Sequence, residues 1–236
     1  MRTMTQTLSL HDITKDYGGA PVLAGISLNI QPGELVAVMG PSGSGKSTLL
    51  HCMSGVLRSS DGTVSFGDTQ LSALDDSARS RLRLENFGFV FQDGQLLPEL
   101  SNMDNVALPA LLCGARRSVA RKKAMRLLDQ LGLGELAERR PAEVSGGQAQ
   151  RVAIARALAA NPAIVFADEP TGALDQSTGH EVMQLLTTVV RQSGASMVMV
   201  THDPKVADWM ERRVEIRDGI IHDDRRLNVE ARGGQR

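Results

Sequence analysis

The spacing of hydrophobic and polar residues changes several times along the chain, and each spacing predicts a different kind of element. Apolar and polar residues alternate over residues 8–17 and again over residues 22–30, as they do in strands with one buried face. The glycine pair Gly18-Gly19 between these segments favours a turn. The pattern therefore predicts two strands that pair antiparallel.

Continuous apolar runs occupy three further segments, residues 35–38, 163–167 and 196–201. Short runs without alternation are typical of strands that are buried on both faces. Between the last two runs, apolar residues recur at helical spacing from Val182 to Val190. Alternating strands and helices of this kind predict a parallel sheet with helices on its faces.

Three other features complete the expected organisation. Thr178 and Glu181 have the spacing of a capping box, so we expect Thr178 to cap the helix that follows. Residues 93–160 show helical periodicity with little strand signal, which predicts an inserted helical subdomain. The chain after Asp223 is polar, and we expect it to fray. The expected single domain thus has an α/β core with an antiparallel β subdomain at residues 1–92 and 161–222, a helical subdomain at 93–160, and a polar tail at 223–236.

Composition and charge narrow the class of protein. The formal net charge is −1, so no overall electrostatic attraction to nucleic acid exists, and we expect no nucleic-acid partner. The apolar runs are far shorter than the ~20 residues that a membrane-spanning helix needs. Cys52 and Cys113 are too few and too far apart for a disulfide framework, and no signal peptide is apparent, so we expect a reducing, cytosolic setting.

One local run of basic residues is an exception to the balanced charge. These residues fall largely opposite the apolar positions of a predicted helix, and they could form a solvated face or contact lipid headgroups or an acidic loop of a partner. The run consists of Arg116, Arg117, Arg121, Lys122, Lys123 and Arg126.

A glycine-rich loop follows the first apolar run and precedes a predicted helix beginning near Lys46. Its glycines let successive backbone N–H groups approach phosphate oxygens, and the helix start adds unpaired donors and a positive dipole end. Lys46 would contact the β- and γ-phosphates of a nucleotide, and the Ser47 hydroxyl would bind Mg²⁺. The loop matches the pattern G-x-x-x-x-G-K-[ST] with Gly40, Pro41, Ser42, Gly43, Ser44, Gly45, Lys46 and Ser47, followed by Thr48.

Two adjacent carboxylates, Asp168 and Glu169, end the second apolar run. Open α/β sheets bind their ligands at the carboxyl ends of strands, where this pair is expected to lie. Asp168 would hold Mg²⁺ through water, and Glu169 would polarise a water molecule for attack on the γ-phosphate. The pair predicts an enzyme that hydrolyses a nucleotide.

Val144-Ser145-Gly146-Gly147-Gln148, followed by Arg151, resembles the signature motif of the ATP-binding-cassette (ABC) family. The resemblance extends from Tyr17 to about Gly219 in order and spacing, and it implies a RecA-like phosphate-loop NTPase core with antiparallel β and helical subdomains. Two residues depart from the family pattern, Val144 for leucine and Ala149 for glutamine, and neither removes a phosphate donor. The other matching positions are the adenine-stacking aromatic Tyr17, the Q-loop Gln92, the D-loop Ala173-Leu174-Asp175 and the switch histidine His202.

The resemblance implies a mechanism. Ser145, Gly146, Gly147 and Gln148 of one copy would close on the ATP held by another, which makes a homodimer with two sandwiched nucleotides and Asp175 near the shared sites. His202 would contact the γ-phosphate. Gln92 would be a further ligand of Mg²⁺ and would link the site to the helical subdomain and to an integral membrane permease on a separate chain. The expected location is the cytoplasmic face of the inner membrane.

The sequence of this chain is similar to those of the macrolide-exporter, lipoprotein-releasing and haem-exporter subgroup at residues 87–92, 96–98 and 105–109. Its cargoes include macrolides, haem, antimicrobial peptides and lipoproteins, and the sequence does not choose among them. A mechanotransmission ATPase of the cell-division type, which drives an extracytoplasmic enzyme without transport, would use the same motifs. An ABC ATPase acting on DNA or ribosomes is disfavoured, because those usually carry long coiled coils or two cassettes per chain.

Overall fold

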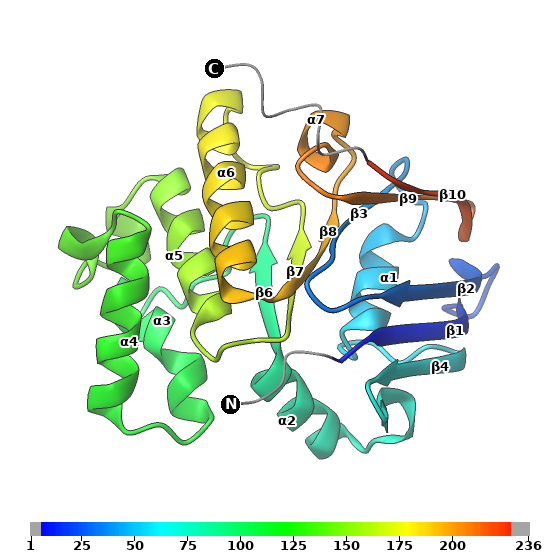
Figure 1. Ribbon diagram of the computed structural model, residues 1–236, viewed down its shortest axis with the longest axis horizontal. Coiled ribbons are helices and arrows are strands. Elements are labelled where there is room, and N and C mark those ends of the chain that lie inside the picture. The colour runs from blue at the N-terminus through cyan, green and yellow to red at the C-terminus, as the bar shows by residue number, and fades with distance from the viewer. Residues whose placement is uncertain (1–5, 228–236) are drawn as a thin grey trace. The chain divides into compact units, whose positions relative to one another are not determined.

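The computed structural model describes residues 6–227. Its contacts divide the chain into two compact units (Figure 1). Unit 1 combines Met1–Leu74 with Met197–Arg236, and unit 2 is Asp75–Ser196. No helix within residues 6–227 has both the length and the apolar composition needed to cross a membrane. The predicted boundaries at residues 92/93 and 160/161 remain a proposal.

Unit 1 contains the antiparallel sheet that the alternating segments predict. Leu8 pairs with Ile30 on one side and with Phe66 on the other, so β1 is a central strand. The side chains of Ile26, Leu28 and other alternate residues of β2 are buried, as the period of two requires. The strand order is β2-β1-β4-β5. The bounds are Leu8–Lys15 for β1, Leu23–Ile30 for β2, Asp61–Phe66 for β4 and Thr69–Gln70 for β5.

Unit 1 also holds the strand that precedes the glycine-rich loop. Every residue of β3 is buried, which explains the continuous apolar run. Its neighbours β8 and β9 both run parallel to it, and β10 pairs antiparallel with β9. The bounds are Leu35–Met39 for β3, Ser196–Val200 for β8, Arg212–Arg217 for β9 and Ile220–Arg226 for β10; the helices of this unit are α1 (Lys46–Met53), η1 (Leu71–Ala73) and α7 (Pro204–Ala207).

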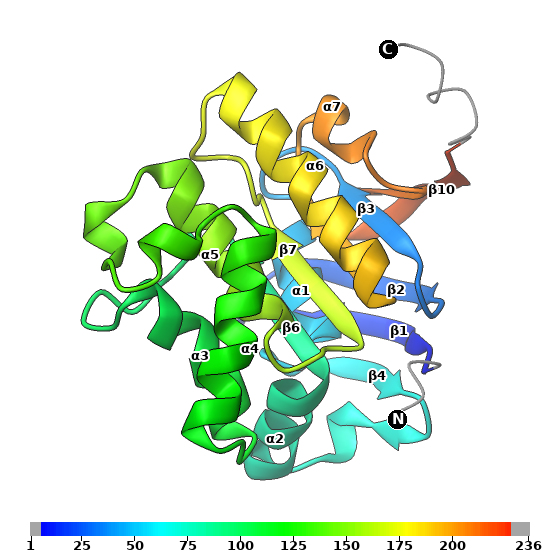
Figure 2. The same cartoon turned by 60° about the vertical axis from the view of Figure 1, so that its left-hand side comes forward.

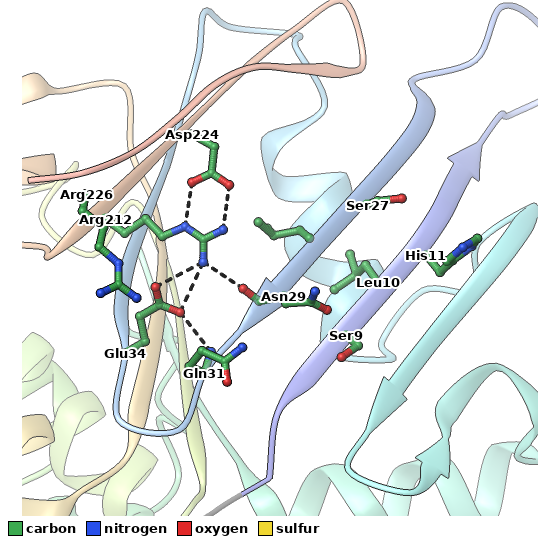
Figure 3. A pocket seen from close by; sticks show the side chains of 11 residues that line it. Ser9, Leu10, His11, Ser27, Asn29, Gln31, Glu34, Arg212, Asp224 and Arg226 are labelled. Atoms are coloured by element: carbon green, nitrogen blue, oxygen red, sulfur yellow. Dashed lines mark hydrogen bonds and ion pairs between the residues drawn. The ribbon is translucent and has the colours of Figure 1, made fainter.

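The expectation that the chain frays after Asp223 is wrong for the residues up to Arg226, which belong to β10. Asp224 accepts two hydrogen bonds of 2.6 Å from the guanidinium of Arg212 on β9 (Figure 3). Arg212 also contacts the carboxylate of Glu34 at 3.1 Å and the carbonyl of Asn29 at 2.8 Å. The Asp224 hydrogen bonds, supported by Glu34, raise the pKa of Arg212. A polar strand is thus stabilised by an ion-pair network, while residues 228–236 lie outside the described part of the chain.

Replacing Arg212 with Met should destabilise unit 1. Glu34 is 9% exposed and would lose a charge partner in a place where water solvates it poorly. We expect a loss of about 2–3 kcal/mol in the free energy of unfolding, measured by urea denaturation. The matched control is Arg225→Met, because Arg225 pairs with Asp223 at the surface and its loss should cost less than about 1 kcal/mol. Equal losses for the two variants would contradict a stabilising role for the network.

Unit 2 contains the predicted helices and two parallel strands. Strand β6 pairs with β7 in register from Phe87 opposite Ile164 to Phe91 opposite Asp168. Helix α3 packs against both α4 and α5, and the three lie side by side (Figure 2). The bounds are Asp76–Asn86 for α2, Phe87–Phe91 for β6, Asn102–Leu112 for α3, Arg117–Gln130 for α4, Gly134–Leu136 for η2, Pro141–Glu143 for η3, Gly146–Leu158 for α5, Ile164–Asp168 for β7 and Gln176–Ser193 for α6.

The predicted cap of α6 is wrong. The helix begins at Gln176, two residues before Thr178, and its N-cap is Asp175, whose carboxylate accepts hydrogen bonds from the backbone N–H groups of Ser177 and Thr178. Glu181 makes an ion pair of 2.6 Å with Arg151 instead of closing a capping box. A charged carboxylate is a strong N-cap because it also interacts favourably with the positive end of the helix dipole.

Arg116 of the basic run is the N-cap of α4, and the other members lie on this helix, where Arg121 and Lys123 are half-buried and the rest are exposed. Arg121 contacts Asp104 and Glu138, and Lys123 donates to the side chain of Asn161 at 2.6 Å. Ala120, Ala124 and Leu128 of this helix are buried, whereas Val119 is exposed.

The two cysteines differ in their surroundings. Cys52 is buried in α1, and burial raises the pKa of its thiol to about 11. Cys113 is exposed at the end of α3.

Candidate functional site

The glycine-rich loop joins β3 to α1 in unit 1, in the strand–loop–helix order that its sequence predicts. A Cβ at Gly40 would lie 2.1 Å from the carbonyl oxygen of Ile216, and one at Gly45 would lie 2.7 Å from that of Val22. Gly45 also has a left-handed φ of +93° and caps α1 without a side-chain hydrogen bond. Only glycine fits these two positions, and the backbone N–H groups at the start of α1 receive no cap from the Gly45 position.

Two polar side chains of this loop are poised for an anion. The ammonium of Lys46 donates to the carbonyl of Pro41 at 2.8 Å, which holds the cation over the loop. The hydroxyl of Ser44 is buried and has no hydrogen-bond partner among the described residues. Burying a hydroxyl without a partner costs free energy, so a ligand oxygen that accepts from Ser44 would remove that cost. A phosphate group fits this set of donors.

Tyr17 and His202 lie elsewhere in unit 1. Tyr17 is 65% exposed between β1 and β2, and the ammonium of Lys15 lies 5.1 Å from the centroid of its ring. His202 follows β8, and the backbone N–H of Thr201 donates to the carbonyl of Val38 at 3.1 Å. This bond places His202 at the same edge of the sheet as the start of the glycine-rich loop.

The acidic pair lies in unit 2, at the end of β7. Asp168 is opposite Phe91 in the β6–β7 pairing, so Glu169 and Gln92 are the first residues after two adjacent parallel strands. The side chain of Gln92 lies against Gly172, where a Cβ would be only 3.0 Å from its Nε2. Glu169 has a left-handed φ of +47°, a backbone conformation that residues other than glycine seldom adopt. Such strain is concentrated at functional sites, which agrees with the role predicted for Glu169.

The signature segment begins α5 with a reciprocal cap. The backbone N–H of Gln148 donates to the Ser145 hydroxyl at 3.3 Å, and the Gln148 side chain accepts from the Ser145 N–H at 2.9 Å. A Cβ at Gly147 would lie 2.4 Å from a methyl carbon of Thr178, so α5 and α6 approach closely at this glycine. The result is a second helix N-terminus, with the positive end of a dipole and free backbone donors.

Asp175 lies beside this end as the N-cap of α6. Hydrogen bonds from the hydroxyls of Ser177 and Thr178, both 2.6 Å, hold the pKa of Asp175 well below its usual range. The carboxylate is therefore charged at neutral pH. Because its folded-state pKa is lowered, its contribution to stability is present above the unfolded pKa and is lost only as the pH falls through the folded value.

The structure brings the predicted site residues together in two groups. Within unit 1 the glycine-rich loop and His202 share one sheet edge, with Tyr17 on a separate turn. Within unit 2 Gln92, Asp168 and Glu169 meet at the ends of β6 and β7, while Ser145–Gln148 and Asp175 lie at the starts of α5 and α6. Sequence analysis missed Gln150, a buried amide that contacts both strand ends; a polar residue among the apolar positions of this helix was the available signal.

A glycine-rich loop at a helix start and an acidic pair after a buried strand define a phosphate-loop NTPase. The chain matches the family model described as ABC transporter over residues 23–172. It therefore belongs to the ABC transporter family, and the resemblance found in its sequence is confirmed. Hydrolysis of ATP, the activity predicted from the acidic pair, is confirmed at the level of this family.

Curated relatives agree with the subgroup. The macrolide export ATP-binding/permease protein MacB of Marinobacter nauticus is 48% identical over 221 residues, which cover 92% of this chain and 34% of the relative. The lipoprotein-releasing system ATP-binding protein LolD of Geobacter metallireducens is 44% identical over 222 residues, which cover 92% of this chain and 99% of the relative. The chain thus spans about a third of the MacB protein and nearly all of LolD.

Solved structures confirm the predicted fold class. A dimeric ATP-binding cassette in a post-hydrolysis state, with bound ADP and phosphate, has a TM-score of 0.85 and 39% identity, covering 94% of this chain and 99% of the other. A cassette of a bacterial ABC transporter, also described as dimeric, has a TM-score of 0.85 and 40% identity over the same shares.

Proposed function

We propose that this chain is the ATP-hydrolysing subunit of an export or extrusion system and acts on an integral membrane permease carried by a separate chain. One observation carries the proposal. A single chain has two helix N-termini suited to bind phosphate, those of α1 and α5, together with the acidic pair at the end of β7. This combination suits a protein that closes on ATP as a homodimer. Its place would be the cytoplasmic face of the cell membrane, peripheral to the permease.

In this proposal unit 1 binds ATP. Tyr17 stacks on the adenine, for which its exposed ring is suited. Lys46 contacts the β- and γ-phosphates, and the unpartnered hydroxyl of Ser44 supplies a further donor. Backbone N–H groups complete the cradle in the loop formed by Gly40, Pro41, Ser42, Gly43, Ser44, Gly45, Lys46, Ser47 and Thr48.

Oxygen atoms of Ser47, Gln92 and Asp168 would hold Mg²⁺, a cation that prefers oxygen ligands. When bound, the ion neutralises charge that develops on the phosphate oxygens. Glu169, whose backbone has a left-handed φ of +47°, orients and deprotonates the attacking water. His202 would contact the γ-phosphate.

The signature end completes the site in the dimer. Ser145, Gly146, Gly147 and Gln148 of one copy would close on the ATP bound by the other, with Asp175 at the shared boundary. The two similar solved structures are dimeric cassettes, which supports this assembly. Hydrolysis would then remove the γ-phosphate that joins the two copies and release the dimer.

The names of the relatives favour export over mechanotransmission, because they describe macrolide export and lipoprotein release. We infer a hydrophobic small molecule or a lipid-modified protein as cargo. The test is reconstitution of the chain in proteoliposomes with a candidate permease, sought first in the neighbouring open reading frame. MgATP should be hydrolysed faster with the permease than without it, and candidate cargo should move. Stimulated hydrolysis without cargo movement, together with activation of an extracytoplasmic hydrolase, would instead support mechanotransmission.

Replacing Tyr17 with Ala should weaken the binding of ATP by about 10-fold, because one stacked base contributes about 1–3 kcal/mol. The rate of hydrolysis at saturating ATP should stay near the wild-type value, because the ring takes no part in the chemistry. Equilibrium binding of ATP and of inorganic triphosphate checks this prediction. A loss of affinity that is equal for the two ligands would remove Tyr17 from the adenine site.

A further inference from the structure

One buried amide bridges the two strand ends that carry the predicted catalytic residues. Gln150 on α5 is 2% exposed, and its Nε2 donates to the carbonyl oxygens of Phe91 at 2.8 Å and of Pro170 at 2.7 Å. Phe91 directly precedes Gln92, and Pro170 directly follows Glu169. Both hydrogen atoms of a single side chain therefore fix the backbone on either side of the proposed site.

A second side chain of α5 holds the loop that follows Gln92. The guanidinium of Arg156 donates to the carbonyl of Gln95 at 2.6 Å and to that of Gly94 at 2.7 Å. Gly94 and Gln95 both have left-handed φ values, +70° and +44°, and the second is unfavourable for a residue with a side chain. Arg156 thus stabilises a strained turn of the loop. Burial lowers the pKa of Arg156.

These contacts are directed at the backbone. All four hydrogen bonds go to carbonyl oxygens, so they fix the position of the loop without regard to its side chains. Burying the Gln150 amide is unfavourable unless it is hydrogen-bonded, and an apolar residue would suit a simple core position better. The same helix begins at Gly146, one turn before Gln150. The side chains of Gln150 and Arg156 and the signature end therefore belong to one rigid element.

We propose that Gln150 and Arg156 are positioning residues for ATP hydrolysis, which hold Gln92 and Glu169 at a fixed place relative to the signature end of α5. The proposal rests on the function proposed above. Neither residue contacts the nucleotide. Each acts through the backbone that it holds. A displacement of the loop after β6 would therefore move Glu169 and the start of α5 together.

The test compares variants that change the donors. Gln150→Glu keeps the size of the side chain but supplies at most one hydrogen in place of two, and Arg156→Ala removes both donors together with the side chain. We expect the kcat of MgATP hydrolysis to fall about 10–100-fold in each, while the Kd for ATP stays within about 2-fold. Arg156→Lys keeps the charge and a donor, and we expect it to retain kcat within about 3-fold. Matched controls on the exposed side of α4 are Gln130→Glu and Arg126→Ala, which should match the wild type.

Thermal unfolding of each variant separates positioning from stability. A folded Gln150→Glu or Arg156→Ala chain with the wild-type kcat would overturn the proposal, as would a parallel loss of kcat, ATP affinity and melting temperature. If Gln150→Glu fails to fold, the comparison of Arg156→Lys with Arg156→Ala decides, because equal damage by both contradicts rescue by the retained donor. A wild-type chain that hydrolyses no MgATP would instead refute the proposed function, and the inference with it.

Discussion

A Glu169→Gln chain should bind MgATP with nearly wild-type affinity and hydrolyse it about 10²–10⁴-fold more slowly. The amide has the shape of the carboxylate but cannot accept a proton from the attacking water. Because ATP would join two copies, the variant should accumulate as an ATP-bound dimer. Single-turnover hydrolysis and size-exclusion chromatography with light scattering measure the two effects.

The control for this variant is Glu135→Gln, which changes the same chemical group at an exposed position in η2. It should retain the wild-type rate and remain monomeric after ATP is consumed. A Glu169→Gln chain that stays monomeric at saturating MgATP and hydrolyses it normally would show that another group is the base. Either result leaves the phosphate loop to be tested separately.

The second large effect is expected from Lys46→Ala. Lys46 supplies the charged side chain of the loop, and charge-assisted hydrogen bonds to phosphate are about twice as strong as neutral ones. Within residues 6–227 its ammonium donates to the carbonyl of Pro41, a contact whose loss the fold should tolerate. We expect the Kd for ATP to rise by about 100-fold or more, measured by equilibrium binding.

Lys122→Ala is the matched control, because Lys122 is exposed on α4 and is far from the loop in sequence. It should leave ATP affinity unchanged. Thermal unfolding of both variants ensures that a loss of binding does not reflect a loss of structure. ATP binding by Lys46→Ala within about 3-fold of the wild type would exclude the proposed role.

The features that could be predicted well from the sequence depend on the local pattern of apolar, polar and glycine residues. Strands β3, β7 and β8 were evident because a short, unbroken apolar run has few alternatives to a buried strand. The glycine-rich loop was evident because phosphate binding requires both its glycines and the strand and helix on either side of it. The acidic pair followed from its place at a strand end.

The features that were missed depend on contacts distant in sequence. Strand β10 is polar, and its order comes from pairing with β9 and from the ion pair of Asp224 with Arg212. The cap of α6 was misplaced because two candidates compete within four residues, and Asp175 is the stronger acceptor. The strand ends that Gln150 bridges lie 59 and 20 residues from it along the chain, so helical spacing alone could not reveal them.

The contrast between the two cysteines makes this chain convenient for spectroscopy. The thiolate of a cysteine attacks a thiol-reactive probe, and the raised pKa and burial of Cys52 leave almost no thiolate available there at neutral pH. Cys113 is exposed at the end of α3. A fluorophore or spin label would therefore attach to unit 2 at a single native position, without any cysteine being added or removed. Movements of the helical elements during an ATP cycle could then be followed in the unaltered sequence.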